Sequence, residues 1–263
     1  MLPKIILTLL FSISAYSADY QTCTADNIGQ VAIAGFCISS ETPTPISQAE
    51  QSELSKILVS FEIRFPKLFS IVHKNGYFRL IIKPTQIGEN GGAVLAKTLT
   101  EQKIIVLYKD FFIANKKIPA LKNFKFSVSE VALLHELIHA FDEDNNLVVT
   151  NLEPLGWNLT EHVPIDGYRI HSLPQIANTW IKATTINTIL ADLSPLLPTL
   201  GPWEIYTLAR DRVKTLGYPT VYSIVGGPLE SFAELGAYIA LDPEASNYIP
   251  LKTIHWFQKN ILR

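Results

Sequence analysis

The sequence predicts an α+β fold, with a small mixed sheet and a buried helix followed by a mostly helical C-terminal lobe. Three observations predict it. First, 48% of the 263 residues are hydrophobic and only 17% are charged, which allows a sizeable core and excludes a disordered chain. Second, segments rich in β-forming residues lie between residues 77 and 108. Third, apolar residues recur at helical spacing on both sides of this region, most densely over residues 127–142.

The first 18 residues are expected to be a signal peptide. Lys4 provides a short positive start, an apolar run follows from Ile5 to Ile13, and Ala15-Tyr16-Ser17 resembles a small-x-small cleavage site. The run is too short to span a bilayer. We therefore expect a secreted or periplasmic protein with no stable membrane insertion after signal cleavage. The net charge of −2 provides no general basic field for binding nucleic acid.

Residues 19–45 are expected to form an N-terminal segment held by a disulfide. Cys23 and Cys37 are the two cysteines of the chain, and an even number in an exported protein favours a disulfide bond. Closing so short a loop stabilises a fold by about 3 kcal/mol in the chain-entropy description. The bond would hold a hairpin within residues 30–38, before a Ser/Thr/Pro-rich linker at 39–47.

Residues 46–143 are expected to form an α+β lobe. A helix is predicted over residues 46–72, and Pro66 should kink or end it. Its apolar stripe consists of Leu54, Ile57, Leu58, Phe61 and Phe65. Three strands are predicted after it, at residues 77–83, 93–99 and 103–108.

The helix predicted over residues 127–142 is apolar on nearly every side and should be buried. Ser127 and Glu130 have the spacing of a capping box at its start. The chain from 144 to 263 is expected to form the helical C-terminal lobe. Its predicted helices are residues 180–193, 203–216, 229–241 and 251–262.

The buried helix carries the motif His-Glu-x-x-His at residues 135–139. Residues four apart lie on one face of a helix, so His135 and His139 can both reach one ion. Zinc suits two imidazoles and one oxygen ligand, with a fourth position open for water. The metal lowers the pKa of that water to about 7, and Glu136 could take its proton. Three polar side chains on an otherwise apolar helix need partners, which a bound ion provides.

The third ligand should come from elsewhere in the chain. The metzincin pattern requires a histidine where this chain has Asn145, so that class is excluded. Glu230 is the stronger candidate, because Glu230 and Glu234 share one face of an otherwise apolar helix. Both could instead form the solvated stripe of that helix, with Glu230 favoured in its first turn by the helix dipole. Other possible ligands are His162, Asp166 and His171.

The segments HELIHAFD at 135–142 and ESFAEL at 230–235 resemble the gluzincins of the anthrax lethal factor type. The resemblance implies a zincin-like fold with one Zn²⁺ per chain. It implies that His135, His139 and Glu230 are the metal ligands and that Glu136 is the general base.

The same resemblance assigns roles to four further residues. Asp142 and Glu234 would orient the imidazoles, as outer partners of metal ligands do. In the family a tyrosine shortly before the ligand glutamate stabilises the oxyanion. Tyr222 is the natural match and Tyr218 is its rival.

The sequence thus predicts an exported zinc metallopeptidase, first of all a metalloendopeptidase, that hydrolyses peptide bonds by Glu136-assisted attack of zinc-bound water. A peptide or protein substrate would bind in extended form along the strand predicted at residues 103–108. One alternative is an exported, zinc-stabilised binding module without turnover, closed by His162 or His171 as a fourth ligand. Another is a hydrolase of cell-wall peptide cross-links. The sequence favours no particular oligomeric state.

Overall fold

The computed structural model describes the sheet, the helix with the His-Glu-x-x-His motif and the C-terminal helices. The described residues are 31–43, 46–88, 93–114, 126–143, 162–165, 168–171, 211, 214, 219–220, 222–225 and 228–263. Several predictions lie outside them: the signal peptide at 1–18, Cys23, Asp166, Tyr218, the helix at 180–193 and most of the helix at 203–216. Among the described helices, none combines the length and hydropathy needed to cross a bilayer.

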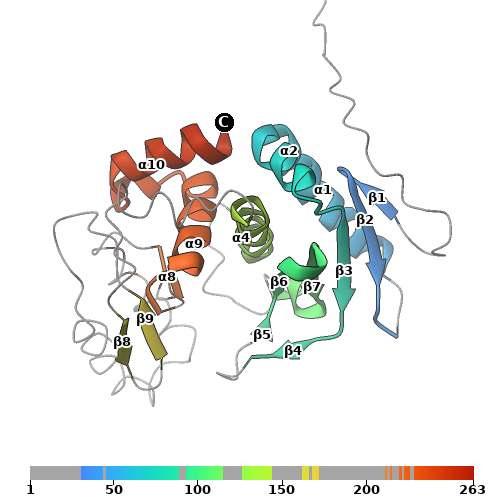
Figure 1. Ribbon diagram of the computed structural model, residues 1–263. Helices are drawn as coiled ribbons and strands as arrows, with labels where there is room; N and C mark the ends of the chain where they lie inside the picture. The colour runs from blue at the N-terminus through green and yellow to red at the C-terminus, as the bar shows by residue number, and fades with distance from the viewer. Residues whose placement is uncertain are drawn as a thin grey trace, which may run out of the picture.

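A five-stranded mixed sheet forms one side of the molecule (Figure 1). In spatial order its strands are β1 (Val31–Ile33), β2 (Phe36–Ser40), β3 (Arg79–Lys83), β7 (Ile104–Tyr108) and β6 (Ala96–Leu99). The strands β2, β3 and β7 are parallel, whereas β1 and β6 run antiparallel to their neighbours. The α+β class and the small mixed sheet are therefore confirmed. Because β2 pairs with β3, the predicted N-terminal hairpin belongs to this sheet; its Cys37 is disulfide-bonded.

The position of β7 contradicts one prediction. Its five residues are all buried, as is typical of a strand in the interior of a parallel sheet. Since β3 and β6 pair with its two sides, β7 has no free edge on which a peptide could bind. The expectation that residues 103–108 bind the substrate is therefore wrong. The two edge strands of the sheet are β1 and β6, and β6 is the one beside β7. It comes from the segment predicted at 93–99, whose first part forms β5 (Ala93–Val94), paired with β4 (Gln86–Ile87).

Two helices replace the single one predicted over residues 46–72. The first, α1 (Gln48–Arg64), begins at a capping box between Ser47 and Glu50. The second, α2 (Pro66–Lys74), starts with Pro66 at its first position, where the missing N–H costs nothing. The proline therefore ends one helix and begins the next.

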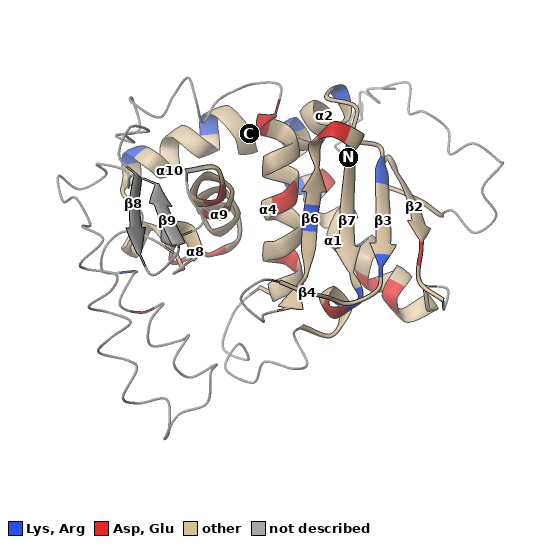
Figure 2. Cartoon of the chain, turned by 60° about the horizontal axis from the view of Figure 1, so that its bottom comes forward, with Lys and Arg blue, Asp and Glu red and all other residues tan. Residues whose placement is uncertain are grey.

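The helix α4 (Val128–Asp142) is capped by Ser127 and Glu130 as predicted, and it lies at the centre of the molecule. Figures 1 and 2 both show it between the sheet and α9 (Pro228–Leu241). After α9 the chain continues through η5 (Ala245–Asn247) into α10 (Leu251–Phe257) and the π-helical η6 (Gln258–Leu262), which packs against α2. One continuous hydrophobic core joins β2, α1, α4, α9 and the C-terminus.

Gly236 on α9 allows the close approach of three helices. A Cβ at this position would lie 2.6 Å from Ile138 Cδ1 of α4 and 3.0 Å from the Phe257 ring of α10. A Cβ so near to Ile138 Cδ1 would force the end of this buried side chain, or the helices themselves, to shift. This packing sets the distance between the motif on α4 and the carboxylates of α9.

Candidate metal centre

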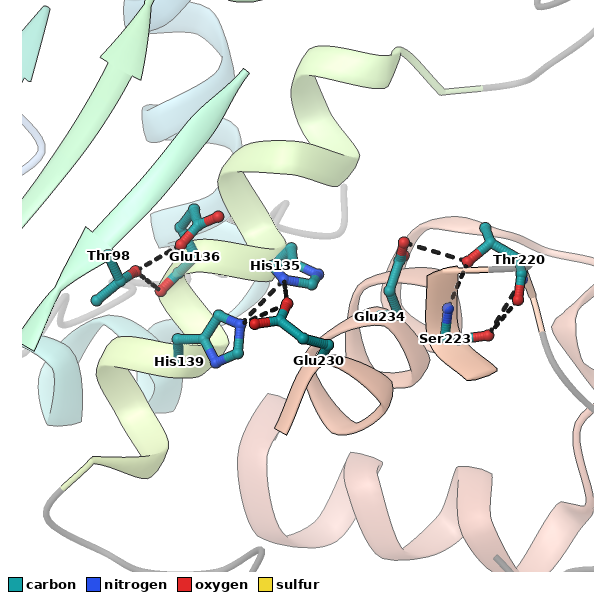
Figure 3. Close-up of polar contacts among 8 residues, drawn as sticks. All are labelled: Thr98, His135, Glu136, His139, Thr220, Ser223, Glu230 and Glu234. Carbon is teal, nitrogen blue, oxygen red and sulfur yellow. Dashed lines mark hydrogen bonds and ion pairs between the residues drawn. The ribbon is translucent and has the colours of Figure 1, made fainter. Parts of the chain in front are cut away.

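Side chains from two helices meet between α4 and α9 (Figure 3). His135 and His139 come from adjacent turns of α4, and Glu230 comes from the first turn of α9. Glu230 Oε2 lies 2.9 Å from His135 Nε2 and 3.3 Å from His139 Nε2, and the two Nε2 atoms are 3.0 Å apart. The three residues thus bring one ligand atom each to a single point.

This geometry suits a divalent metal ion. Zinc–ligand bonds of about 2.0–2.1 Å in a tetrahedron place the ligand atoms about 3.3 Å from one another. The observed separations, 2.9 to 3.3 Å, are close to that value. His135, His139 and Glu230 therefore form a group that could bind a metal ion. Among the candidate third ligands whose side chains are described, Glu230 is the one that lies at the two histidines.

The charged side chains of this centre shift the pKa values of Glu230 and His135 in opposite directions. Burial acts to raise the pKa of Glu230, but hydrogen bonds with His135 and His139 outweigh it and hold this pKa well below its usual range. Burial acts to lower the pKa of His135, but the hydrogen bond with Glu230 and the nearby carboxylates raise it to about 9. A metal ion bound at this point would compete with a proton for Nε2 of His135.

Glu136 points from α4 toward the edge strand β6. Its side chain is only 8% exposed. The Thr98 hydroxyl, on β6, lies 2.7 Å from Glu136 Oε2 and 3.0 Å from the Glu136 carbonyl oxygen (Figure 3). The predicted base is therefore next to the metal ligands in the chain and in contact with the sheet edge in space. Thr98 was not predicted, since nothing local in the sequence identifies the edge strand.

Glu234 is buried one turn after Glu230 and contacts Thr220. Its Oε1 accepts a hydrogen bond from Thr220 Oγ1 at 3.2 Å, and its Oε2 has no hydrogen-bond partner among the described residues. Burial raises the pKa of this carboxyl. The charges of Glu234 and His135 interact, but orientation of an imidazole by Glu234 stays a prediction. Thr220 also accepts the backbone N–H of Ser223 at 3.0 Å, so it links Glu234 to the start of α8 (Tyr222–Val225).

Asp142 and Tyr222 lie at opposite ends of the centre. Asp142 is buried in the last turn of α4, and its predicted contact with an imidazole stays a prediction. Tyr222 is 46% exposed, with its ring centroid 6.1 Å from that of His135. Partial burial raises the pKa of its hydroxyl, and the charge of Glu230 raises it further. Its rival Tyr218 lies outside the described residues.

The other possible ligands belong to a hairpin or fall outside the described chain. His162 and His171 are register partners on β8 (His162–Ile165) and β9 (Tyr168–His171), of which only the backbone is described. Asp166, between the two strands, is not described. The fourth-ligand role considered for His162 and His171 therefore stays a prediction.

Comparison of the chain with protein-family models, with curated proteins and with solved structures finds no match. The resemblance to gluzincins thus depends on two short motifs and on the geometry that joins them.

Proposed function

We propose that this protein is an exported zinc-dependent peptidase. The observation that carries the proposal is the convergence of His135, His139 and Glu230 on one point. The buried carboxylate of Glu136 is close enough to this centre to raise the pKa of His135. Two histidines and one glutamate are the protein ligands of many catalytic zinc sites, in which the fourth position stays open. A structural zinc site would instead need a fourth protein ligand.

Bound zinc would supply a Lewis acid that polarises the substrate carbonyl and lowers the pKa of a water. Glu136 would take a proton from the attacking water and pass it to the leaving amine. Tyr222 would donate a hydrogen bond to the oxygen on which negative charge develops. The position of Tyr222 supports this role, because its ring centroid lies 6.1 Å from that of His135.

The substrate we propose is an extended peptide that pairs with β6. No described strand occupies the outer side of β6, and Thr98 on this strand contacts Glu136. Pairing with the edge of a sheet is a common way to bind extended peptides, because the backbone groups of the edge strand are unpaired.

The test is a metal assay combined with hydrolysis by wild type and by Glu136→Gln. We expect about one zinc per chain in both proteins. Hydrolysis should fall by about 10²–10⁴-fold in Glu136→Gln, since the general base is lost. Glu244→Gln, an exposed glutamate distant from the ligands in the chain, is the matched control and should behave as wild type.

Two substrates distinguish the kinds of amide that the enzyme cleaves. Purified peptidoglycan and an unfolded protein would be incubated with the zinc-loaded enzyme, and the products identified by mass spectrometry. Cleavage of the unfolded protein supports the peptidase, whereas release of cross-link peptides alone would assign the site to cell-wall hydrolysis. Full activity of Glu136→Gln would contradict the mechanism.

A further inference from the structure

The hydrogen bonds of β6 show which of its backbone groups are free. Tyr108 N donates to Leu95 O at 2.9 Å, so Leu95 and Tyr108 form a hydrogen-bonded pair at the start of the β6–β7 ladder. In an antiparallel ladder such pairs alternate with pairs that exchange no hydrogen bonds. The register then assigns Lys97 and Leu99 to hydrogen bonds with β7, and it turns the N–H and C=O groups of Ala96 and Thr98 toward the open edge.

Thr98 therefore has two distinct faces. Its backbone N–H and C=O point to the edge where a peptide would pair. Its hydroxyl points toward α4 and lies 2.7 Å from Glu136 Oε2, as Figure 3 shows. A hydroxyl has one proton, and the carboxylate oxygen at 2.7 Å is a stronger acceptor than the Glu136 carbonyl oxygen at 3.0 Å. Donating the proton to Oε2 holds this oxygen and leaves the other, Oε1, for a second partner.

We propose that Thr98 is a positioning residue, which pairs with the substrate backbone through its own backbone and fixes the Glu136 carboxylate through its hydroxyl. This inference rests on the proposed function and deepens it, because it defines the register of the bound peptide. The substrate residue that pairs with Thr98 is placed beside Glu136. One residue thus links the position of the peptide to the position of the base.

The first experiment tests the hydroxyl of Thr98 while leaving its backbone unchanged. Thr98→Val keeps the shape and the β-branch of the side chain but removes the hydroxyl, whereas Thr98→Ser keeps the hydroxyl. The control is Thr100→Val, at an exposed position just after β6. Zinc content, kcat and KM for a peptide substrate would be measured for all three variants and for wild type.

We expect Thr98→Val to bind one zinc, to keep KM within about twofold and to lose kcat by about 10- to 100-fold, as when a hydrogen bond to a charged group is removed. KM should stay because backbone pairing is intact. Thr98→Ser should recover most of kcat, and Thr100→Val should match wild type. The proposal is overturned if Thr98→Val keeps the wild-type kcat, or if Thr98→Ser is as impaired as Thr98→Val.

The second experiment needs no activity. A double-mutant cycle of Thr98→Val and Glu136→Ala, read from urea unfolding of the metal-free protein, should be non-additive if the two side chains interact. Additive effects in an active enzyme would overturn the Thr98 proposal alone. The two effects could instead be non-additive in a protein that binds zinc but hydrolyses no peptide. That result would overturn the proposed function, and with it the positioning role of Thr98, but it would confirm the contact between Thr98 and Glu136.

Discussion

Two buried histidine sites in this molecule have opposite electrostatics. His135 lies between α4 and α9, close to the carboxylates of Glu136, Glu230 and Glu234, and its pKa is raised to about 9. His73 lies at the end of α2, among the rings of Phe36, Phe69 and Phe78, and its pKa is lowered. Both residues are 7% exposed. Burial alone therefore does not decide how a histidine titrates.

The difference lies in the partners of the two rings. Burial acts to lower the pKa of both histidines, and at His135 the carboxylates more than compensate for it. The ring nitrogens of His73 instead lie 3.0 Å from the Tyr77 carbonyl and 3.3 Å from the Ala34 carbonyl, which are uncharged. The charge of Glu62 also acts to raise the pKa of His73, but less than burial lowers it. The ring of His73 thus connects the turn of the β1–β2 hairpin to the start of β3. A buried histidine with carboxylate neighbours is suited to a cation, and one with carbonyl and aromatic neighbours is suited to structure.

The largest effect we expect comes from removing the carboxylate of Glu230, which should abolish the difference in pKa between His135 and His73. In Glu230→Gln the zinc affinity should fall by more than the roughly 10- to 100-fold that loss of an outer partner costs, since a direct ligand is lost. The pKa of His135 should fall from about 9 toward its ordinary value, because its main hydrogen-bonding carboxylate is gone. Calorimetry with zinc and an NMR titration of the histidine ring protons would measure both.

The His73 resonance is the internal control for that titration. His73 is distant from Glu230 in the chain and belongs to a different cluster of side chains, so its titration should be unchanged. A His135 pKa that stayed near 9 in Glu230→Gln would show that Glu136 and Glu234, and not the proposed ligand, set the charge of the site.

The proton on His135 should be released when zinc binds. With a pKa of about 9 in the metal-free protein, His135 is protonated at pH 7, and a metal ligand must be neutral. Zinc binding at pH 7 should therefore release about one proton from this residue, and affinity should rise by up to about tenfold per pH unit until pH 9. Calorimetry in buffers of different ionisation enthalpy measures the released protons. No release at pH 7, with affinity independent of pH, would contradict the assigned charge of the centre.

The parts of the molecule that follow from local sequence could be predicted. The capping box of Ser127 and Glu130 and the spacing of His135 and His139 depend on residues within one helix, and the structure has both. The break at Pro66 is also local, because a proline lacks the N–H that a continuous helix needs there.

The parts of the molecule that depend on strand order or on helix packing could not be predicted from the sequence. An apolar run such as residues 104–108 does not say which strands lie beside it, so the free edge was assigned to β7 instead of β6. The meeting of Glu230 with His135 depends on how closely α9 approaches α4, which Gly236 decides through its missing side chain. From the sequence alone, Glu230 could be a metal ligand or part of the solvated stripe of its helix. The two alternatives could not be separated, because both place Glu230 on the same face of that helix.

The smallest effect concerns His73 and the pH dependence of stability. Its pKa in the folded protein lies below the unfolded value of about 6.5, so the unfolded chain binds more protons between these two values. Stability should therefore fall as the pH drops below about 6.5, by at most about 1.4 kcal/mol per pH unit from this residue. His73→Asn removes this titration but keeps an N–H donor near the position of Nδ1, for the Tyr77 carbonyl. The free energy of unfolding in urea, measured from pH 5 to pH 7.5, should fall less steeply on acidification in the variant than in wild type.

Glu230 and Glu234 titrate in both proteins, so the difference between the two curves isolates His73. Losing the stacked ring, whose centroid lies 5.2 Å from that of Phe78, lowers the variant's stability by an amount independent of pH. Two parallel curves would mean that His73 titrates alike in both states, and the contrast with His135 would then rest on His135 alone.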